Sequence, residues 1–222
     1  QAVKDRVHSP DWSNGERLNY TLNLARILSE LLPPGIEGSI STSPLSYKPW
    51  MLEEEASKKK AIYTSATNNL IRLTEELLQL KRLTGKTVHI NYYQEWLLPL
   101  GIKKLQESQE ITKQEAEEAV LQHIQLCYDV CHFALAYEKP AEAFAKLKHA
   151  GIRIGKVQLS AALKTTLPED VETRGEIAEV MTSFAESTYL HQVVERSNDG
   201  QLTQYPDLTF ALQHIRKPNA LE

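Results

Sequence analysis

The stretch that decides the fold runs from 112 to 132 and reads TKQEAEEAVLQHIQLCYDVCH. Thr112 and Glu115 form the capping-box pattern with which many helices begin. Ile124 to Tyr128 form a short, largely apolar run that is typical of a buried strand, and Asp129 follows it directly. A helix that leads straight into a buried strand is the repeating unit of α/β proteins with a parallel sheet.

The same alternation continues on both sides of this stretch. The spacing of apolar residues and the turn residues predict helices at 13–33, 70–85, 91–100, 112–123, 140–151, 173–184 and 206–215. Strand signals lie at 39–41, 87–90, 124–129, 152–159 and 188–194. No Gly-rich dinucleotide-binding motif follows a strand, which disfavours a doubly wound sheet. We therefore predict an incomplete (β/α)8 TIM barrel in one domain over 1–222, with about five of the eight strands visible.

Composition and charge narrow the classes of partner. The net charge of −4 gives no general attraction for polyanions, so we expect no nucleic-acid partner. No apolar run approaches the roughly 20 residues that a membrane span needs, so no membrane insertion is expected. The two cysteines, Cys127 and Cys131, are too few for a disulfide framework, and no signal peptide is visible. These features predict a cytoplasmic protein with reduced thiols.

Asp129 and His132 are the strongest candidate site residues. Asp129 stands at the end of the buried strand, and His132 comes three residues later. Side chains just past the carboxyl end of a parallel strand face the ligand side of a barrel. A carboxylate and an imidazole there can bind a divalent metal or act as an acid–base pair. The structural alternative is that Asp129 caps the next turn and His132 packs against it.

The following strands offer candidate substrate-binding residues. Period-two alternation places Lys156, Gln158 and Ser160 on one side of their strand. His191 holds a similar position one strand later, and Ser41 stands at the end of an early strand. Each also has a structural explanation, such as a side chain that holds a loop. No serine-nucleophile elbow, phosphate-binding loop or His-Glu-x-x-His motif is present, so hydrolysis by a serine and phosphoryl transfer lack support.

The segment 128–132, Tyr-Asp-Val-Cys-His, resembles the Asp-x-x-His element of the sugar-phosphate isomerase/epimerase and apurinic-site endonuclease superfamily, whose barrels are xylose isomerase-like. Several stretches are similar to the metabolite-traffic protein EboE family, known from bacterial gene clusters linked to export of secondary-metabolite precursors. In this chain they are 9–12, 38–42, 127–132, 155–160 and 189–194. The resemblance implies a xylose isomerase-like barrel in which Asp129 binds a metal and His132 contacts metal or ligand.

Three departures limit the resemblance. The family's proteins are longer at both ends. They carry an acidic Glu-Pro-Glu-Pro stretch after the strand that Val88–Ile90 resembles, so we expect a missing segment near 90–91. The related isomerases have a metal-binding histidine where this chain has Gln158. Asp129 alone matches the metal set of the superfamily.

Two functions remain open from the sequence. The first is metal-assisted isomerisation or epimerisation of a small hydroxylated or carbonyl metabolite, with Mn²⁺, Zn²⁺, Mg²⁺ or Co²⁺ as cofactor. The second is binding or hand-over of a metabolite without chemistry, in precursor traffic with partner proteins of the same gene cluster. The loss of the metal-type histidine at Gln158 favours the second. DNA repair, as in the endonuclease branch, is disfavoured by the negative charge and the absence of a basic stripe.

Overall fold

The computed structural model describes residues 6–52, 54–92, 97–185 and 192–217. The chain forms two compact units. The first, which we call the sheet unit, contains His8–Asp129 and Pro140–Gln158. The second, the hairpin unit, contains Gln1–Val7, Val130–Lys139 and Leu159–Glu222. Within the described ranges, no helix combines the length and the apolar character required to cross a bilayer.

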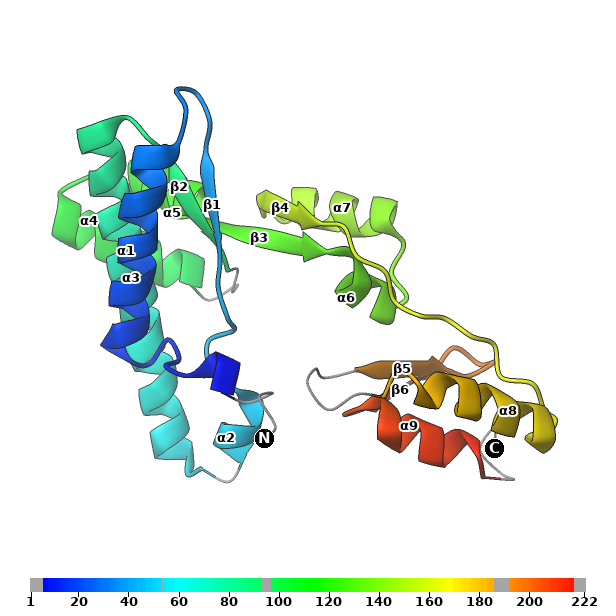
Figure 1. Ribbon diagram of the computed structural model, residues 1–222. Helices are drawn as coiled ribbons and strands as arrows, with labels where there is room; N and C mark the ends of the chain where they lie inside the picture. The colour runs from blue at the N-terminus through cyan, green and yellow to red at the C-terminus, as the bar shows by residue number, and fades with distance from the viewer. Residues whose placement is uncertain (1–5, 53, 93–96, 186–191, 218–222) are drawn as a thin grey trace. The chain divides into compact units, whose positions relative to one another are not determined.

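The sheet unit is built on a four-stranded parallel sheet in the order β1-β2-β3-β4 (Figure 1). The strands are β1 (Gly38–Ser41), β2 (Val88–Asn91), β3 (Ile124–Asp129) and β4 (Ile154–Gln158). Its helices are α1 (Gly15–Leu31), α2 (Lys48–Leu52), α3 (Ala56–Thr84), α4 (Leu97–Gln109), α5 (Lys113–His123) and α7 (Pro140–His149). A 3-10 turn, η1 (Arg6–His8), precedes α1 in the chain, and only His8 of this turn belongs to the sheet unit. Strands adjacent in chain order are therefore adjacent in the sheet, and their parallel pairing is what the sequence predicted.

Local interactions within a few residues set one end of each of three helices. The side chain of Asn14 accepts a hydrogen bond from the Glu16 amide at 2.9 Å and so caps α1. The capping box of Thr112 and Glu115 starts α5, as predicted. Gly85 ends α3 in the left-handed region, at a φ of 70°, where a residue without Cβ is favoured.

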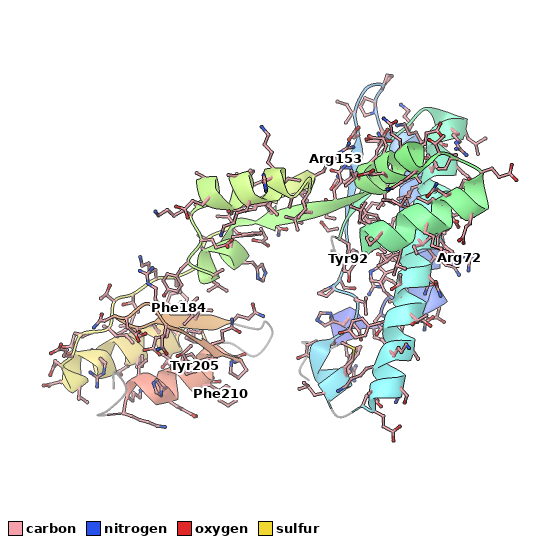
Figure 2. The ribbon with its side chains drawn as sticks, turned by 180° about the vertical axis from the view of Figure 1, so that it is seen from behind. Arg72, Tyr92, Arg153, Phe184, Tyr205 and Phe210 are labelled. Atoms are coloured by element: carbon pink, nitrogen blue, oxygen red, sulfur yellow. The ribbon has the colours of Figure 1, made fainter. Side chains whose placement is uncertain are left out.

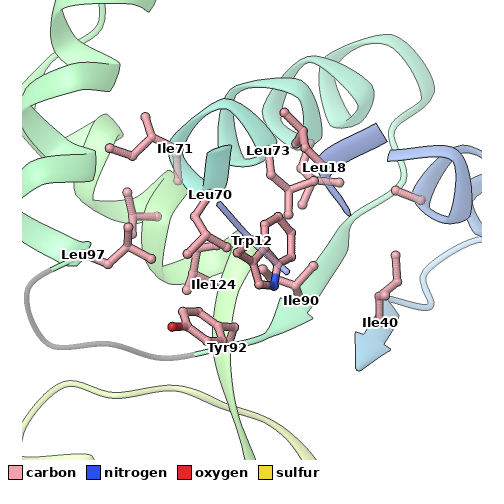
Figure 3. Close-up of a cluster of buried hydrophobic side chains, with 14 of the residues drawn as sticks. Trp12, Leu18, Ile40, Leu70, Ile71, Leu73, Ile90, Tyr92, Leu97 and Ile124 are labelled. Atoms are coloured by element: carbon pink, nitrogen blue, oxygen red, sulfur yellow. The ribbon is translucent and has the colours of Figure 1, made fainter. Parts of the chain in front are cut away.

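The main core lies between the apolar face of the sheet and the helices. Ile40, Ile90 and Ile124 project from three neighbouring strands into this core. Trp12, which is fully buried, and Leu70 of α3 pack in the same cluster (Figure 3). Burial of such side chains contributes roughly 1.5–3 kcal/mol each, so this face of the sheet provides most of the sheet unit's stability.

The N-terminal side of β4 is tied to α5 by an ion pair. Arg153, directly before β4, donates two hydrogen bonds to the carboxylate of Glu118, at 2.9 and 2.7 Å. Figure 2 shows Arg153 at this junction. The paired guanidinium and carboxylate raise the pKa of Arg153 and lower that of Glu118.

The hairpin unit contains α6 (Val130–Leu135), α8 (Val171–Thr182), α9 (Leu208–Ile215) and the antiparallel pair β5 (Val193–Arg196) and β6 (Leu202–Tyr205). Its core is small, with Ala178, Leu208, Leu212 and Ile215 as the buried cluster. Arg196 lies over the ring of Tyr137, 4.4 Å from the ring centre, and the Tyr137 hydroxyl donates to the carbonyl of Val194. These contacts hold the segment after α6 against the hairpin.

The prediction of a (β/α)8 TIM barrel is wrong for this chain. The parallel sheet of the described residues has four strands instead of eight, and β5 and β6 form a separate antiparallel sheet. The predicted strand at 188–194 lies partly outside the described residues, and its last two residues belong to β5, which pairs antiparallel with β6 instead of joining the parallel sheet. The reason is the tight turn at 197–201, in which Gly200 has a φ of 89° and the Gln201 amide donates to the side chain of Asp199. This turn reverses the chain at once, and a parallel neighbour would need a crossover helix.

One predicted helix start is also wrong. Thr173 and Glu176 form a capping-box pattern in the sequence, but α8 begins at Val171. Its N-cap is Asp170, whose carboxylate accepts from the Thr173 amide at 2.7 Å and from the Thr173 hydroxyl. Asp is as good an N-cap as Thr, so two caps competed and the earlier one prevailed. The missing segment expected near 90–91 stays a prediction.

Candidate functional site

One face of the parallel sheet is polar, which is unusual for a sheet covered by helices. Side chains alternate along the strands, and Ile40, Ile90 and Ile124 lie in the core described above. Strand pairing places residues Ser41 and Asn91 side by side, then Asn91 and Gln125, Cys127 and Lys156, and Asp129 and Gln158. Together with Ser39 and His89, these residues make up the polar face.

The polar face is concave. The Lys156 ammonium of β4 donates to the Ser41 hydroxyl of β1 at 2.8 Å, although two strands separate them in the sheet. His89 Nε2 of β2 lies 3.2 Å from the carbonyl oxygen of Gly155 in β4, across β3. Side chains of outer strands meet in this way only when the sheet curls towards that face. The four strands thus have the curvature of a half-barrel, with the polar side chains inside.

Gly155 permits this close approach. A Cβ at this position would lie 2.6 Å from both Gln125 Oε1 and His89 Nε2, well inside van der Waals contact. The register between β3 and β4 also shifts at Leu126 and Cys127, which is the irregularity of a β-bulge. The bulge and the lack of a Cβ at Gly155 together bring the β4 backbone within hydrogen-bonding distance of His89.

Two buried acceptors on the polar face have no hydrogen-bond partner among the described residues. The carbonyl of Gly155 can only accept, so His89 Nε2 carries the hydrogen and Nδ1 is left with a lone pair. The Asn91 amide nitrogen donates to Ser39 Oγ at 2.7 Å, which leaves Asn91 Oδ1 as an acceptor. His89 Nδ1 and Asn91 Oδ1 are both unpaired within the described part of the chain, and the two residues are only 4% and 7% exposed.

His89 is neutral at physiological pH. Burial lowers its pKa below the ordinary value and outweighs the opposing effects of the Gly155 carbonyl and of Glu37. His123, directly before β3, is fully buried, and its Nδ1 donates to the carbonyl of Val88 at 2.7 Å. Burial lowers the pKa of His123 to about 4. The sheet unit therefore contains two neutral imidazoles, and the one on the polar face is available to accept hydrogen bonds.

The second group of candidate residues lies at the end of β3. Asp129, Cys131 and His132 span four positions of the chain, and one ligand atom of each lies within 4.8 Å of the others. A carboxylate, a thiolate and an imidazole fit zinc well and suit Mg²⁺ poorly. Three protein ligands with a further position open are the usual arrangement of catalytic zinc. The predicted pair Asp129 and His132 is thus brought together locally, and Cys131 joins it.

Cys127 differs from Cys131 in its surroundings. Neither Cys127 nor Cys131 forms a disulfide bond within the described part of the chain. Cys127 Sγ lies 3.8 Å from Gln158 Oε1 on the polar face, and burial raises the pKa of its thiol above the ordinary value. At neutral pH Cys127 is therefore a neutral thiol that lines the polar face beside Gln158.

The predicted substrate-binding residues divide into three groups. Lys156, Gln158 and Ser41 lie on the polar face, and Lys156 contacts Ser41 directly. Ser160 lies beyond β4, where its hydroxyl accepts from the Cys131 amide at 3.0 Å. His191 falls outside the described residues.

The sequence reasoning missed His89, Asn91 and Gln125. A signal for His89 and Asn91 was present, because Val-His-Ile-Asn at 88–91 alternates apolar and polar residues. This alternation places the two polar side chains on the same face of the strand. Gln125 shows the same alternation in β3, with Cys127 and Asp129.

Comparisons with protein-family models, with curated proteins and with solved structures find no match to this chain. The similarity to the EboE family and to xylose isomerase-like proteins therefore stays a prediction from the sequence. The functional argument has to be made from the polar face and from the residues that follow β3.

Proposed function

We propose that the concave polar face of the sheet binds one small hydroxylated metabolite. The observation that carries this proposal is the pair of buried acceptors, His89 Nδ1 and Asn91 Oδ1, which no described residue satisfies. A buried polar group without a partner costs about 1–3 kcal/mol, so native proteins rarely keep one without a reason. Hydroxyl or amine hydrogens of a ligand would donate to both atoms and offset this cost.

Other groups of the polar face indicate which atoms the ligand should carry at the end opposite its hydroxyl groups. The ammonium of Lys156 is the cation of the polar face and already donates to Ser41. Gly155, whose carbonyl holds His89, is the residue next to Lys156 in the chain, so acceptor and donor groups lie close together. A ligand with hydroxyl groups at one end and a carbonyl, carboxylate or phosphate oxygen at the other would match both. Short sugars, their acids and their phosphates have this chemistry.

The electrostatics of the face favour binding over proton transfer. A general base works best when its pKa lies near the working pH. Burial moves the pKa of His89 below its ordinary value, which makes the imidazole a weaker base while its lone pair still accepts hydrogen bonds. We therefore propose binding or hand-over of the metabolite as the primary function of the polar face.

The test is a binding screen with a variant that removes one acceptor. Tetroses, pentoses, hexoses, their aldonic acids and their phosphates would be titrated into the full chain, with chemical-shift changes in amide spectra as the readout. Asn91→Leu should abolish binding and change stability little, because it removes the unpaired buried Oδ1 together with the hydrogen bond from the amide nitrogen to Ser39. Thr74→Val is the matched control, since Thr74 is a buried polar residue of α3 whose hydroxyl donates to Leu70 within its own helix. Binding by no compound, or undiminished binding by the Asn91 variant, would contradict the proposal.

A metal-assisted isomerisation or epimerisation is the second candidate, favoured by the proximity of Asp129, Cys131 and His132. These residues would hold a zinc-type ion. Such an ion, when bound, polarises neighbouring hydroxyl and carbonyl oxygens of a substrate. On the protein side, Asp129 lies opposite Gln158 at the carboxyl end of β3, where Gln158 can orient a substrate by hydrogen bonds.

Cobalt substitution tests this candidate independently of the polar face. Addition of Co²⁺ to the full chain should produce a thiolate-to-cobalt absorption band, and metal content by mass spectrometry should approach one ion per chain. Cys131→Ser should remove the band, whereas Cys127→Ser, a change of the same kind four residues earlier, should keep it. A band that survives in the Cys131 variant, or metal content that is the same in both variants, would rule the cluster out.

A further inference from the structure

A groove separate from the polar face lies between α3 and α4, with a volume of about 700 Å³. One stripe of α3 lines it, at the three- and four-residue spacing of a helix face: Lys60, Tyr63, Thr67 and Ile71. Leu100 and Lys104, one turn apart on α4, form the other side. Small-molecule sites commonly have volumes of about 300–1,000 Å³, so the groove is large enough for one such molecule.

The surface of the groove is mainly apolar, although Thr64 and Asn68 of α3 also line it. Ile71 is only 5% exposed and belongs to the main core, together with Leu97 at the start of α4 (Figure 3). Thr67 donates its hydroxyl to the Tyr63 carbonyl at 2.6 Å, so its hydrogen-bonding capacity is directed into the helix. Tyr63 and Leu100 remain about half exposed, at 46% and 45%. The exposed rings and aliphatic groups of Tyr63 and Leu100 thus adjoin the buried Ile71, and a contiguous apolar surface of this kind often marks an interaction site.

The charged side chains that line the groove are both positive. Lys60 comes from α3 and Lys104 from α4, and both are exposed. None of the described lining residues carries a carboxylate, and no described residue forms an ion pair with either lysine. By contrast, Lys58, on the preceding turn, pairs with Glu54 at 2.5 Å. The protein as a whole is negative, at −4, so a purely positive groove is a local feature and not a consequence of composition.

We propose that this groove binds one amphipathic carboxylate, a molecule with an apolar chain and a single acidic end. The apolar chain would lie along Tyr63, Ile71 and Leu100, and the carboxylate would be held by Lys60 or Lys104. One small molecule fits the groove better than a protein partner, because eight residues line the groove, whereas stable protein interfaces involve roughly 20–30 residues on each side. The proposal does not depend on the metabolite proposed for the polar face, which shares none of these residues.

Dodecanoate, kept below its micelle concentration, is the probe, and dodecanol is the neutral probe of the same length. Titration into the full chain should shift amide signals of α3 and α4 with both compounds, more strongly with dodecanoate. The double variant Lys60→Gln/Lys104→Gln should weaken dodecanoate about ten-fold, since each exposed ion pair contributes a few-fold, and should leave dodecanol unchanged. The matched control is Lys103→Gln/Lys113→Gln, which removes the same charge from exposed positions that do not line the groove.

A groove-filling variant provides the steric test. Thr64 is exposed and lines the groove, so Thr64→Trp should fill it and abolish binding of both probes while the chain stays folded. Three results would overturn the proposal: no shift in α3 or α4, equal weakening in the control double variant, or undiminished binding after Thr64→Trp. Binding to anionic phospholipid vesicles without binding of monomeric dodecanoate would also overturn it, because that result would indicate a membrane surface as the partner.

Discussion

Arg174 should be the residue on which the hairpin unit depends most. It lies in the first turn of α8 and is only 1% exposed. Its guanidinium donates to the carbonyls of Ile215 at 3.1 Å and Lys217 at 3.0 Å, at the end of α9. It also donates to Pro168 at 3.1 Å and Glu169 at 2.6 Å, directly before α8. A cation at the C-terminus of a helix is favourable, and here it joins two helices as well.

The expected loss in the free energy of unfolding follows from these four hydrogen bonds. Each bond from a charged donor contributes roughly 1.5–3 kcal/mol, but the four act together and are not additive. Arg174→Met keeps most of the side-chain volume and removes every donor, which leaves four carbonyls to find new partners. We expect a loss of about 3–5 kcal/mol in the free energy of unfolding of the hairpin unit.

Hydrogen exchange measured by mass spectrometry can locate this loss. Since about 1.4 kcal/mol corresponds to a factor of ten, amides of α8 and α9 should exchange between about a hundred-fold and several thousand-fold faster. All three tryptophans, Trp12, Trp50 and Trp96, are in the sequence range of the sheet unit. Tryptophan fluorescence during chemical unfolding therefore reports on the sheet unit, and its midpoint should change little in the variant.

Arg216→Met is the matched control, because Arg216 is an exposed arginine in the same segment. Its loss should cost less than about 0.5 kcal/mol. The reasoning about Arg174 would be refuted if Arg174→Met changed the exchange of α8 and α9 no more than the control does. It would also be refuted if α3 lost as much protection as α8, since the four hydrogen bonds of Arg174 given above lie within the hairpin unit.

Two further predictions concern the sheet unit. Because burial lowers the pKa of His123 to about 4, the unfolded chain binds a proton more readily than the folded one between about pH 6.5 and 4. The free energy of unfolding should therefore fall by about 3 kcal/mol as the pH falls through this window, and His123→Gln should show a correspondingly smaller fall in pH-dependent urea unfolding. Gly155→Ala should destabilise by about 1–3 kcal/mol, because its Cβ would lie 2.6 Å from His89 and Gln125 side-chain atoms. It should also weaken metabolite binding in the amide titration, and an unchanged His89 ring signal in the variant would argue against the contact.

The sequence alone determined several helix ends and the strands of the sheet unit. The helix predicted at 91–100 is wrong in its bounds, because α4 covers Leu97–Gln109 and Asn91 ends β2. Asn14, the capping box at Thr112 and Glu115, and Gly85 each act through hydrogen bonds or backbone angles within a few residues. The strand that ends at Asp129 was also predicted correctly, because its apolar run and the preceding cap lie next to each other in the chain. Such signals are local, so they can be read without knowledge of the rest of the fold.

Only the tertiary structure decided the number of strands in the sheet and the identity of the polar face. The curl that brings Lys156 to Ser41 joins residues 115 positions apart, and the bond between His89 and Gly155 joins residues 66 positions apart. The burial of His89 and Asn91 likewise depends on how four separate strands pair and bend. No local pattern encodes that curvature. It arises from the packing of the helices on one face of the sheet, and on the other face from the bulge at Leu126 and Cys127 and from the lack of a side chain at Gly155.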